Sequence, residues 1–265
     1  IHGGLRYLEY YEFSLVRKAL KEREVLLKAA PHIIQPLKFL LPHHKGLRPH
    51  WFIRLGLFLY DYLGGRKILP ASTSVKFDKG ILKPEFKRGF EYSDCRVDDA
   101  RLVVLNAQRA RDHGAEILVR HKCISAKREG DRWQIEVQNL KTHLTHTVKA
   151  KVLVNAAGPW VDNIIANVMD KPDEKLMRLV KGSHIIVDKI YDHDKAYLFQ
   201  GEDGRIIFTI PYLNDFTLIG TTGLDYEGDL SKVTISEEEI DYLCQMASDY
   251  LSEPVNKSQI VESFA

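Results

Sequence analysis

Three closely spaced apolar runs between residues 178 and 223 place the strongest constraint on the fold. They read RLVKGSHIIVDKI, KAYLFQGEDGRIIFTIPY and FTLIGTTG. Each run is rich in β-branched and aromatic residues, which is typical of strands. Asp203-Gly204 and Asn214-Asp215 supply turn residues between neighbouring strands. Strands this close together and joined by such turns indicate an antiparallel sheet.

A second cluster of strand-like runs comes earlier in the chain. It comprises AEILVRHKCISAKREG, RWQIEVQNL and HTVKAKVLVNAAG, within residues 115–158. Helices are expected at 14–28, 51–63, 98–114 and from Ser236 onward, where Ser236 and Glu239 have the spacing of a capping box. Residues 31–51, rich in Pro and His, are expected to be irregular or briefly helical, and residues 80–94 extended.

These elements predict a mixed α/β chain made of two interleaved domains. One is expected to comprise residues 1–30 and 94–170, and the other residues 31–93 and 171–265 with the antiparallel sheet. The chain has 265 residues and a net charge of only +2, so nothing in its overall charge favours nucleic acid. The three cysteines, Cys95, Cys123 and Cys244, form no CxxC and suggest a reducing, intracellular setting. No signal peptide is expected, since the N-terminus lacks a basic region followed by an apolar one. No transmembrane span is expected either, since Arg54 and Asp61 interrupt the most apolar window.

The stretch KVLVNAAGPWVDNI, residues 151–164, is the first candidate for chemistry. An apolar strand runs into small residues and then a helix, so a ligand can approach the backbone and an anion can meet the helix N–H groups. A tight strand-to-helix turn without a ligand explains the pattern equally well, because it is not GxGxxG.

Two further stretches carry polar residues beside glycines. In VKGSHIIV, residues 180–187, His184 can accept a proton near neutral pH, although a lone strand histidine is more often structural. In IHGGLRYL, residues 1–8, Arg6 can clamp a phosphate and Tyr7 can add a hydroxyl, or Arg6 can simply be an exposed helix-start residue. No metal site is expected, because His143 and His146 lack further ligands.

Taken together, these blocks closely resemble the FAD-dependent respiratory glycerol-3-phosphate dehydrogenases. The matching blocks are IHGGLRYLEYYEFSLVRKALKEREVLLKAAPH, LRPHWFIRLGLFLYDYLGGR, LKPEFKRGFEYSDCRVDDARLV, LVNAAGPWVD, RLVKGSHIIV and RIIFTIPYLNDFTLIGTT. They follow the order of the family and cover nearly the whole chain. The resemblance implies a FAD-dependent oxidoreductase fold of the glutathione-reductase or D-amino-acid-oxidase type. It also implies an internal fragment without the N-terminal dinucleotide loop and the C-terminal part.

The resemblance implies roles for the candidate residues. Arg6 and Tyr7 would bind the substrate phosphate, and His184 would be the catalytic base. The expected FAD contacts are His2, Gly3, Gly4, Cys123, Ile124, Asn155, Ala156, Ala157, Gly158 and Trp160. In the family an Asp usually follows IGTT, whereas this chain has Gly223 there and Asp225 two residues later.

The implied activity is oxidation of glycerol 3-phosphate to dihydroxyacetone phosphate, with electrons passed through FAD to membrane quinone. A glycerophosphate oxidase that uses oxygen, or a non-catalytic binding fragment, is the alternative, and the fragment by itself is expected to be inactive. The resemblance further implies a peripheral protein on the cytoplasmic face of the inner membrane, and it leaves a homodimer open.

One region offers a surface for an anionic membrane. Residues 38–67 interleave basic side chains (Lys38, Lys45, Arg48, Arg54, Arg66, Lys67) with apolar ones (Trp51, Phe52, Leu57, Phe58). A solvated charged face over a buried helix is the alternative explanation.

Overall fold

A computed structural model describes residues 1–65, 67–77, 80–171 and 173–265 of the chain. Its contacts divide the chain into two compact units. Unit 1 comprises residues 1–103, 181–224 and 234–265, and unit 2 comprises residues 104–180 and 225–233. This division by contacts places residues 1–30 with residues 31–93, because the first helix packs on the central sheet. The expected division into a cofactor domain and a substrate domain therefore stays a prediction about function.

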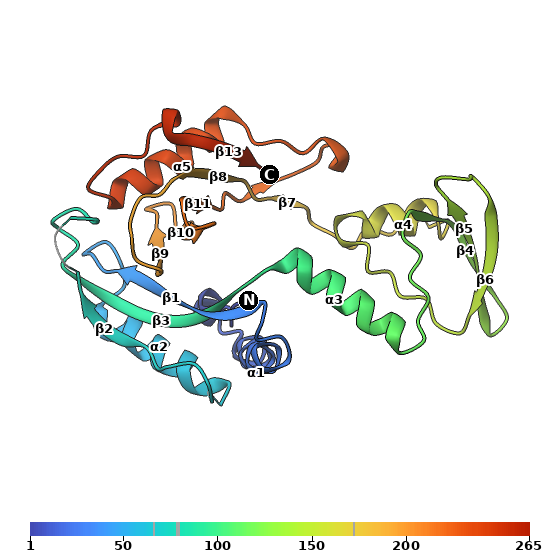
Figure 1. Cartoon of the computed structure of the whole chain (residues 1–265), viewed down its shortest axis with the longest axis horizontal. Coiled ribbons are helices and arrows are strands. Elements are labelled where there is room, and N and C mark those ends of the chain that lie inside the picture. The colour runs from blue at the N-terminus through green and yellow to red at the C-terminus, as the bar shows by residue number, and fades with distance from the viewer. Residues whose placement is uncertain (66, 78–79, 172) are drawn as a thin grey trace. The chain divides into compact units, whose positions relative to one another are not determined.

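Unit 1 is built on an eight-stranded sheet with the order β13-β8-β11-β10-β9-β1-β3-β2. The pair β1–β9 is parallel and the other pairs are antiparallel, so the predicted antiparallel sheet is confirmed (Figure 1). Its strands are β1 (Ile34–Pro42), β2 (Thr73–Lys76), β3 (Arg88–Val97), β8 (His184–Asp188), β9 (Ala196–Gln200), β10 (Ile206–Tyr212), β11 (Phe216–Gly220) and β13 (Ile260–Phe264).

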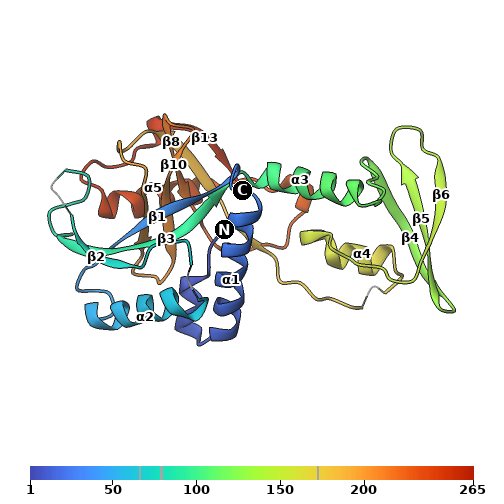
Figure 2. The ribbon, with the colours of Figure 1, turned by 60° about the horizontal axis from the view of Figure 1, so that its bottom comes forward.

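Helices cover the two faces of this sheet differently. On one face, α1 (Phe13–Ala29) and α2 (His50–Leu63) pack with β1 and β3 around Leu20, Leu57 and Phe90 (Figure 2). On the other face, α5 (Glu237–Tyr250) packs Leu243 and Ala247 against the strands from β8 to β11. The short helix η1 (Leu5–Tyr10) precedes α1. The 3-10 helix η4 (Lys257–Gln259) also belongs to unit 1, whereas η3 (Leu230–Lys232) belongs to unit 2.

Strand β1 overturns the expectation of an irregular or briefly helical segment at residues 31–51. Its alternate residues Leu37, Phe39 and Leu41 enter the core shared with α1 and α2, which is the period-2 pattern of a strand. Pro36 is tolerated because β9 pairs with β1 only at Phe39 and Leu40. At Pro36, β1 therefore has a neighbouring strand, β3, on one side only.

Unit 2 contains the sheet β4 (His121–Glu129), β5 (Arg132–Asn139) and β6 (Thr145–Ala150), with the helix α4 (Val161–Asn167). The helix α3 (Asp99–Asp112) leads into it, and Asp98 accepts the Arg101 N–H as the expected cap. The two-residue strands β7 (Val180–Lys181) and β12 (Leu224–Asp225) pair with each other. Residues 151–154, expected to form a strand, are not a strand, because no described strand lies beside them; Val152 and Val154 are exposed.

Among the described residues, no helix is long and apolar enough to cross a membrane. The three cysteines are free thiols, and Cys95 and Cys244 are buried.

A buried carboxylate joins the start of α5 to the sheet. Glu239 closes the predicted capping box with Ser236 and forms an ion pair with Lys181, whose Nζ lies 2.6 Å from its Oε2. It also accepts the hydroxyls of Ser183 and Thr222, both at 2.8 Å. Burial alone would raise the pKa of Glu239, but these donors together lower it to about 2.

We expect Glu239→Gln to destabilise the chain by about 3 kcal/mol at neutral pH, because Lys181 would be left without its partner. The folded-state pKa lies below the usual 4.5. The stabilisation is therefore complete above that value and disappears as the pH falls toward 2. Urea unfolding at several pH values measures this, with the exposed Glu253→Gln as control. An equal loss at acid and neutral pH would contradict the account.

Candidate functional site

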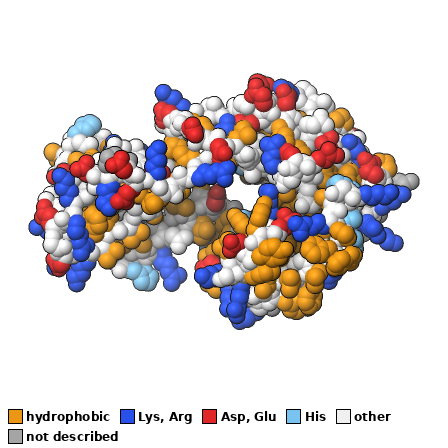
Figure 3. Space-filling model, turned by 180° about the vertical axis from the view of Figure 1, so that it is seen from behind, with side chains coloured by type: hydrophobic (Ala, Val, Ile, Leu, Met, Phe, Trp, Pro, Cys, Tyr) orange, Lys and Arg blue, Asp and Glu red, His pale blue; other side chains and the backbone are white. Residues whose placement is uncertain are grey.

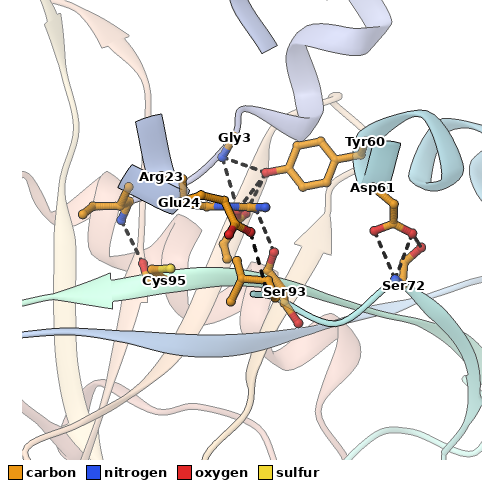
Figure 4. Close-up of polar contacts among 11 residues, drawn as sticks. Gly3, Arg23, Glu24, Tyr60, Asp61, Ser72, Ser93 and Cys95 are labelled. Atoms are coloured by element: carbon orange, nitrogen blue, oxygen red, sulfur yellow. Dashed lines mark hydrogen bonds and ion pairs between the residues drawn. The ribbon is translucent and has the colours of Figure 1, made fainter. Parts of the chain in front are cut away.

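The N-terminal glycines are held by a buried charge cluster (Figure 4). The carboxylate of Asp94, on β3, forms an ion pair with Arg23 of α1 and accepts the hydroxyl of Tyr60 from α2 at 2.8 Å. The Gly3 N–H donates to the Tyr60 hydroxyl at 2.7 Å and to Asp94 at 3.2 Å. Arg23 also donates to the carbonyl of Ser93. The backbone just after His2 is therefore fixed from three separate elements.

Burial governs the electrostatics of this cluster. It raises the pKa of Asp94, while Arg23 and the Tyr60 hydroxyl act in the opposite direction. It also raises the pKa of Tyr60 well above the ordinary value, so the hydroxyl remains a donor. Two neighbouring carboxylates are also satisfied by the backbone: Glu24 accepts the N–H groups of Ile68 and Leu69, and Asp61 accepts that of Ser72.

Gly3 and Gly4 cannot be replaced without strain. A Cβ on Gly3 would lie 2.2 Å from Leu20 Cδ2, and Gly4 has a φ of +75°. The Tyr7 ring packs against Gly4, where a Cβ would lie 2.6 Å from Tyr7 Cδ2. Both glycines are buried, whereas His2, Arg6 and Tyr7 are exposed. The segment thus presents its polar side chains from a rigid backbone.

The exposed Arg6 side chain contacts the turn between β9 and β10. Its Nη2 donates to the carbonyl of Gly204 at 3.0 Å, in the loop that leads into β10. In the described part of unit 1, no hydrogen bond or ring contact joins Arg6 or Tyr7 to His184. The structure therefore places these three residues in one unit without bringing them into direct contact.

His184 begins β8 on the face of the sheet opposite α5. Its neighbours Ile185 and Val187 are buried against α5, whereas His184 and Ile186 are only partly buried. Burial lowers the pKa of His184, so the imidazole is neutral at physiological pH. Its Nδ1 is buried and has no hydrogen-bond partner among the residues described. Because Nδ1 is closed off from solvent, only Nε2 can accept a proton from a ligand.

Lys181 precedes His184 in the motif VKGSH, but its ammonium is not free to bind a ligand. Its ammonium is neutralised by Glu239 and also donates to the carbonyl of Thr234. It therefore supports the backbone before His184 instead of offering a free cation. This pairing could not be predicted from the sequence, because Glu239 is more than fifty residues away and its capping box with Ser236 is a local pattern.

The expected cofactor residues of unit 2 lie on β4 and on the turn from Asn155 to Trp160, and the segment just before that turn shares a small core with β4. Cys123 and Leu153 both pack beside Ala126 and Val168. Ile124 lies at a β-bulge between Cys123 and Ser125, since the register shifts there. Burial raises the pKa of Cys123, which disfavours the reactive thiolate.

The turn from Asn155 to Trp160 is locally organised. The Asn155 side chain accepts the Ala157 N–H at 3.3 Å and donates to the Val161 carbonyl at 3.1 Å. Gly158 has a φ of +56° and begins the 3-10 helix η2 (Gly158–Trp160), followed directly by α4. Ala156, Gly158 and Trp160 are exposed, so small residues and an aromatic ring are accessible at this turn. These features fit close approach of a large flat ligand.

Gly223 stands where the family usually has an Asp, and Asp225 is the nearest carboxylate after it. Asp225, two residues later, forms an exposed bidentate pair with Arg178, with distances of 2.8 and 3.0 Å. Its pKa is lowered by the hydrogen bond from Arg178. A Cβ added to Gly223 would meet no atom within 4 Å, so the structure gives no reason for a glycine there.

We expect Tyr60→Phe to lower the free energy of unfolding by about 1–3 kcal/mol, because a buried carboxylate and the Gly3 N–H would lose a partner. Urea unfolding midpoints measure this. Tyr10→Phe, at a tyrosine that is 60% exposed, is the matched control and should leave the midpoint unchanged. Equal midpoints for all three proteins would contradict a structural role for the cluster.

Comparisons with known proteins agree with these features. The family model for FAD dependent oxidoreductases (DAO) matches residues 1–265. The whole chain aligns with a glycerol-3-phosphate dehydrogenase of Pseudomonas aeruginosa at 54% identity and with the aerobic enzyme of Escherichia coli at 49%. It also aligns with a D-erythritol 1-phosphate dehydrogenase of Brucella abortus at 51% identity. The chain spans about half the length of these relatives, at 52%, 53% and 54%.

Solved structures show the same fold. Bacillus halodurans glycerol-3-phosphate dehydrogenase, complexed with FAD, superposes with a TM-score of 0.69 at 29% identity, over 92% of this chain and 46% of that one. An L-alpha-glycerophosphate oxidase of Mycoplasma pneumoniae with FAD bound has a TM-score of 0.69 at 15% identity, over 93% and 65% of the two chains. The expected mixed α/β oxidoreductase fold is therefore confirmed, and the chain belongs to the family of FAD dependent oxidoreductases.

Proposed function

We propose that this sequence forms part of an FAD-dependent, quinone-linked glycerol-3-phosphate dehydrogenase. The observation that carries the proposal is the position of His184 at the start of β8, facing away from α5, in a chain 54% identical to a glycerol-3-phosphate dehydrogenase. Because the chain spans about half of such relatives, the activity is proposed for the complete enzyme. Inactivity of the 265 residues by themselves stays a prediction.

His184 would take the proton from the C2 hydroxyl of the substrate. A ring nitrogen that is neutral at working pH can accept that proton as the C2 hydride leaves. FAD, when bound, supplies the acceptor for this hydride. The protein must hold C2 and its hydroxyl in line with the base. The rate then depends more on the orientation of the substrate than on the pKa of the base.

Arg6 and Tyr7 would bind the substrate phosphate. Both are exposed, and Arg6 has only one hydrogen bond from its guanidinium among the described contacts, to the Gly204 carbonyl. A planar guanidinium matches two phosphate oxygens at once. If the substrate phosphate, a dianion, replaced the neutral Gly204 carbonyl as the partner of Arg6, the hydrogen bonds of the guanidinium would become stronger.

Residues of both units are proposed for FAD binding, and each unit contributes its own set. Gly3 and Gly4 are buried, and the space that a Cβ would need is filled by Leu20, Tyr60 and Tyr7, so these glycines fix the backbone beside the exposed His2. The turn from Asn155 to Trp160 presents Ala156, Ala157 and Gly158 beside an aromatic ring. Cys123 packs in the same small core as Leu153, which precedes this turn, and we assign Cys123 and its neighbour Ile124 to the same ligand.

Two relatives of nearly equal identity differ in their substrates. One is a glycerol-3-phosphate dehydrogenase and the other a D-erythritol 1-phosphate dehydrogenase. Both names denote phosphorylated polyols, so Arg6 and His184 would serve either substrate. We place glycerol 3-phosphate first and D-erythritol 1-phosphate second, and parallel assays with both distinguish them. Oxygen as acceptor is the further alternative, which hydrogen peroxide formation would reveal.

We expect Arg6→Ala in the complete enzyme to lower kcat/KM for glycerol 3-phosphate about 100-fold, as two charge-assisted hydrogen bonds worth about 3 kcal/mol are lost. Dye-linked oxidation of the substrate measures it. Arg17→Ala, at an exposed arginine of α1, is the matched control and should retain the parent value. Wild-type kinetics for Arg6→Ala would remove Arg6 from the site.

We further propose that α2 lies at a membrane surface. Its exposed side is apolar, with Trp51, Phe52, Leu55, Phe58, Leu59 and Tyr62 accessible to solvent. Hydrophobic side chains gather over this part of unit 1 in Figure 3. A helix that is apolar on both its buried and its exposed side is unusual for a surface helix in water.

Basic side chains contribute less to this membrane surface than the sequence predicts. Lys38 pairs with Glu91, Arg54 donates to Ser72, and Arg48 lies near Glu9 and over the Phe52 ring. Leu57, expected at the surface, is buried at 1% exposure because it faces the core of α1 and β3. Arg66 lies outside the described residues. Membrane binding should therefore depend mainly on the aromatic side chains.

Cosedimentation with anionic liposomes tests this surface. We expect the double variant Trp51→Ser and Phe58→Ser to lower the bound fraction at least ~10-fold, since each buried aromatic contributes about 1.5–3 kcal/mol. Val119→Ser, at a valine 73% exposed in unit 2, is the control and should bind as the parent does. No binding of the parent at low salt would refute the surface.

A further inference from the structure

The sheet register places four residues in one row around His184. Phe208 of β10 lies opposite Gly220 of β11, Gly220 lies opposite His184 of β8, and His184 lies opposite Phe264 of β13. Residues directly opposite one another point to the same face of an antiparallel sheet. The imidazole therefore has one cross-strand neighbour without a side chain and one with a large aromatic ring.

Gly220 makes room for the imidazole on one side. A Cβ at this position would lie 2.1 Å from His184 Cδ2 and 2.8 Å from its Nε2. Any side chain at position 220 would therefore push the ring away or force β11 and β8 apart. The ring lies over the Gly220 backbone because that residue has no side chain.

Phe264 covers the imidazole on the other side. The two ring centroids are 5.2 Å apart and the ring planes meet at 15°, so the rings are stacked. Such a stack fixes the orientation of the imidazole and shields it from water. Phe264 is itself 45% exposed, so the contact forms at the edge of the sheet and not in the core.

We propose that Gly220 and Phe264 are positioning residues that hold the His184 ring in one orientation on the open face of the sheet. This role deepens the proposed function, on which its catalytic meaning rests, because His184 is the proposed base. Neither residue needs to touch the substrate. They act by restricting the imidazole, whose Nδ1 is enclosed, so that Nε2 is held in one direction.

Charged groups near His184 do not explain its neutral state. Lys181 of β7 and Glu239 of α5 neutralise each other, Glu262 of β13 lies opposite Ile186, and Asp188 is at the far end of β8. β11 has no titratable side chain between residues 216 and 220. Burial is the cause of the lowered pKa, and Phe264 supplies part of that burial. Loss of Phe264 should thus raise the pKa of His184 toward 6.5.

The test uses the 265-residue chain and needs no flavin. NMR titration of the His184 imidazole protons, assigned with His184→Gln, gives both its pKa and the ring-current shift from Phe264. We expect Phe264→Ala to raise the pKa toward the ordinary value of an imidazole and to abolish the shift. Phe264→Tyr should restore both, and Val261→Ala on the same strand should change neither.

Gly220→Ala is the second variant, and Gly223→Ala, where an added Cβ meets open space, is its control. We expect Gly220→Ala to displace the imidazole resonances while Gly223→Ala leaves them unchanged. If Phe264→Ala melts at the parent temperature and keeps the parent pKa and ring shift, the proposal is overturned. If Phe264→Ala does not fold, unchanged resonances in Gly220→Ala overturn it in the same way.

Kinetics of the complete enzyme separate this proposal from the proposed function. We expect Phe264→Ala to lower kcat at least ~10-fold with little change in KM, and to move the acid limb of kcat to higher pH. If His184→Gln keeps full activity while the NMR changes occur, the base assignment fails and the positioning of the ring stands. If the NMR changes are absent, the positioning fails whatever the activity.

Discussion

The carboxylate of Asp94 is the contact on which the N-terminal half of unit 1 depends. A buried charge is tolerated only when it is paired and hydrogen-bonded, and here a guanidinium, a phenol and a backbone N–H satisfy it. These donors come from α1, α2 and the segment after His2, while the acceptor is on β3. One side chain thus sets the mutual positions of two helices, a strand and the glycines that precede Arg6. Removal of any partner leaves the others buried without compensation.

A second carboxylate performs the same task at the other end of the sheet. Glu239 ties the start of α5 to Lys181, Ser183 and Thr222, so the backbone just before His184 and just after β11 is fixed. The candidate base is then restricted further by Gly220 and Phe264 across the ladder. Buried ionic networks at both ends therefore stiffen the scaffold, while the polar side chains assigned to the ligands remain on its accessible surface.

Much of this fold could be predicted from local patterns. The capping box at Ser236, the helix start at Asp98 and the turns at Asp203-Gly204 and Asn214-Asp215 are signals within a few residues, and all are present. Strand β1 was not predictable in this way, because Pro36, Pro42 and the histidines on either side of the strand mask its period-2 pattern. The pairing of Asp94 with Arg23, or of His184 with Phe264, depends on sheet register between distant segments. No single-sequence pattern encodes such contacts.

The central claim is that His184 and Arg6 belong to a site that transfers a hydride from a phosphorylated polyol to FAD. The most direct measurement is anaerobic addition of glycerol 3-phosphate to the complete flavin-loaded enzyme while the flavin absorbance is followed. The account predicts rapid bleaching of the flavin with formation of dihydroxyacetone phosphate, slowed strongly in His184→Gln. Flavin that stays oxidised with glycerol 3-phosphate and with D-erythritol 1-phosphate alike would contradict it.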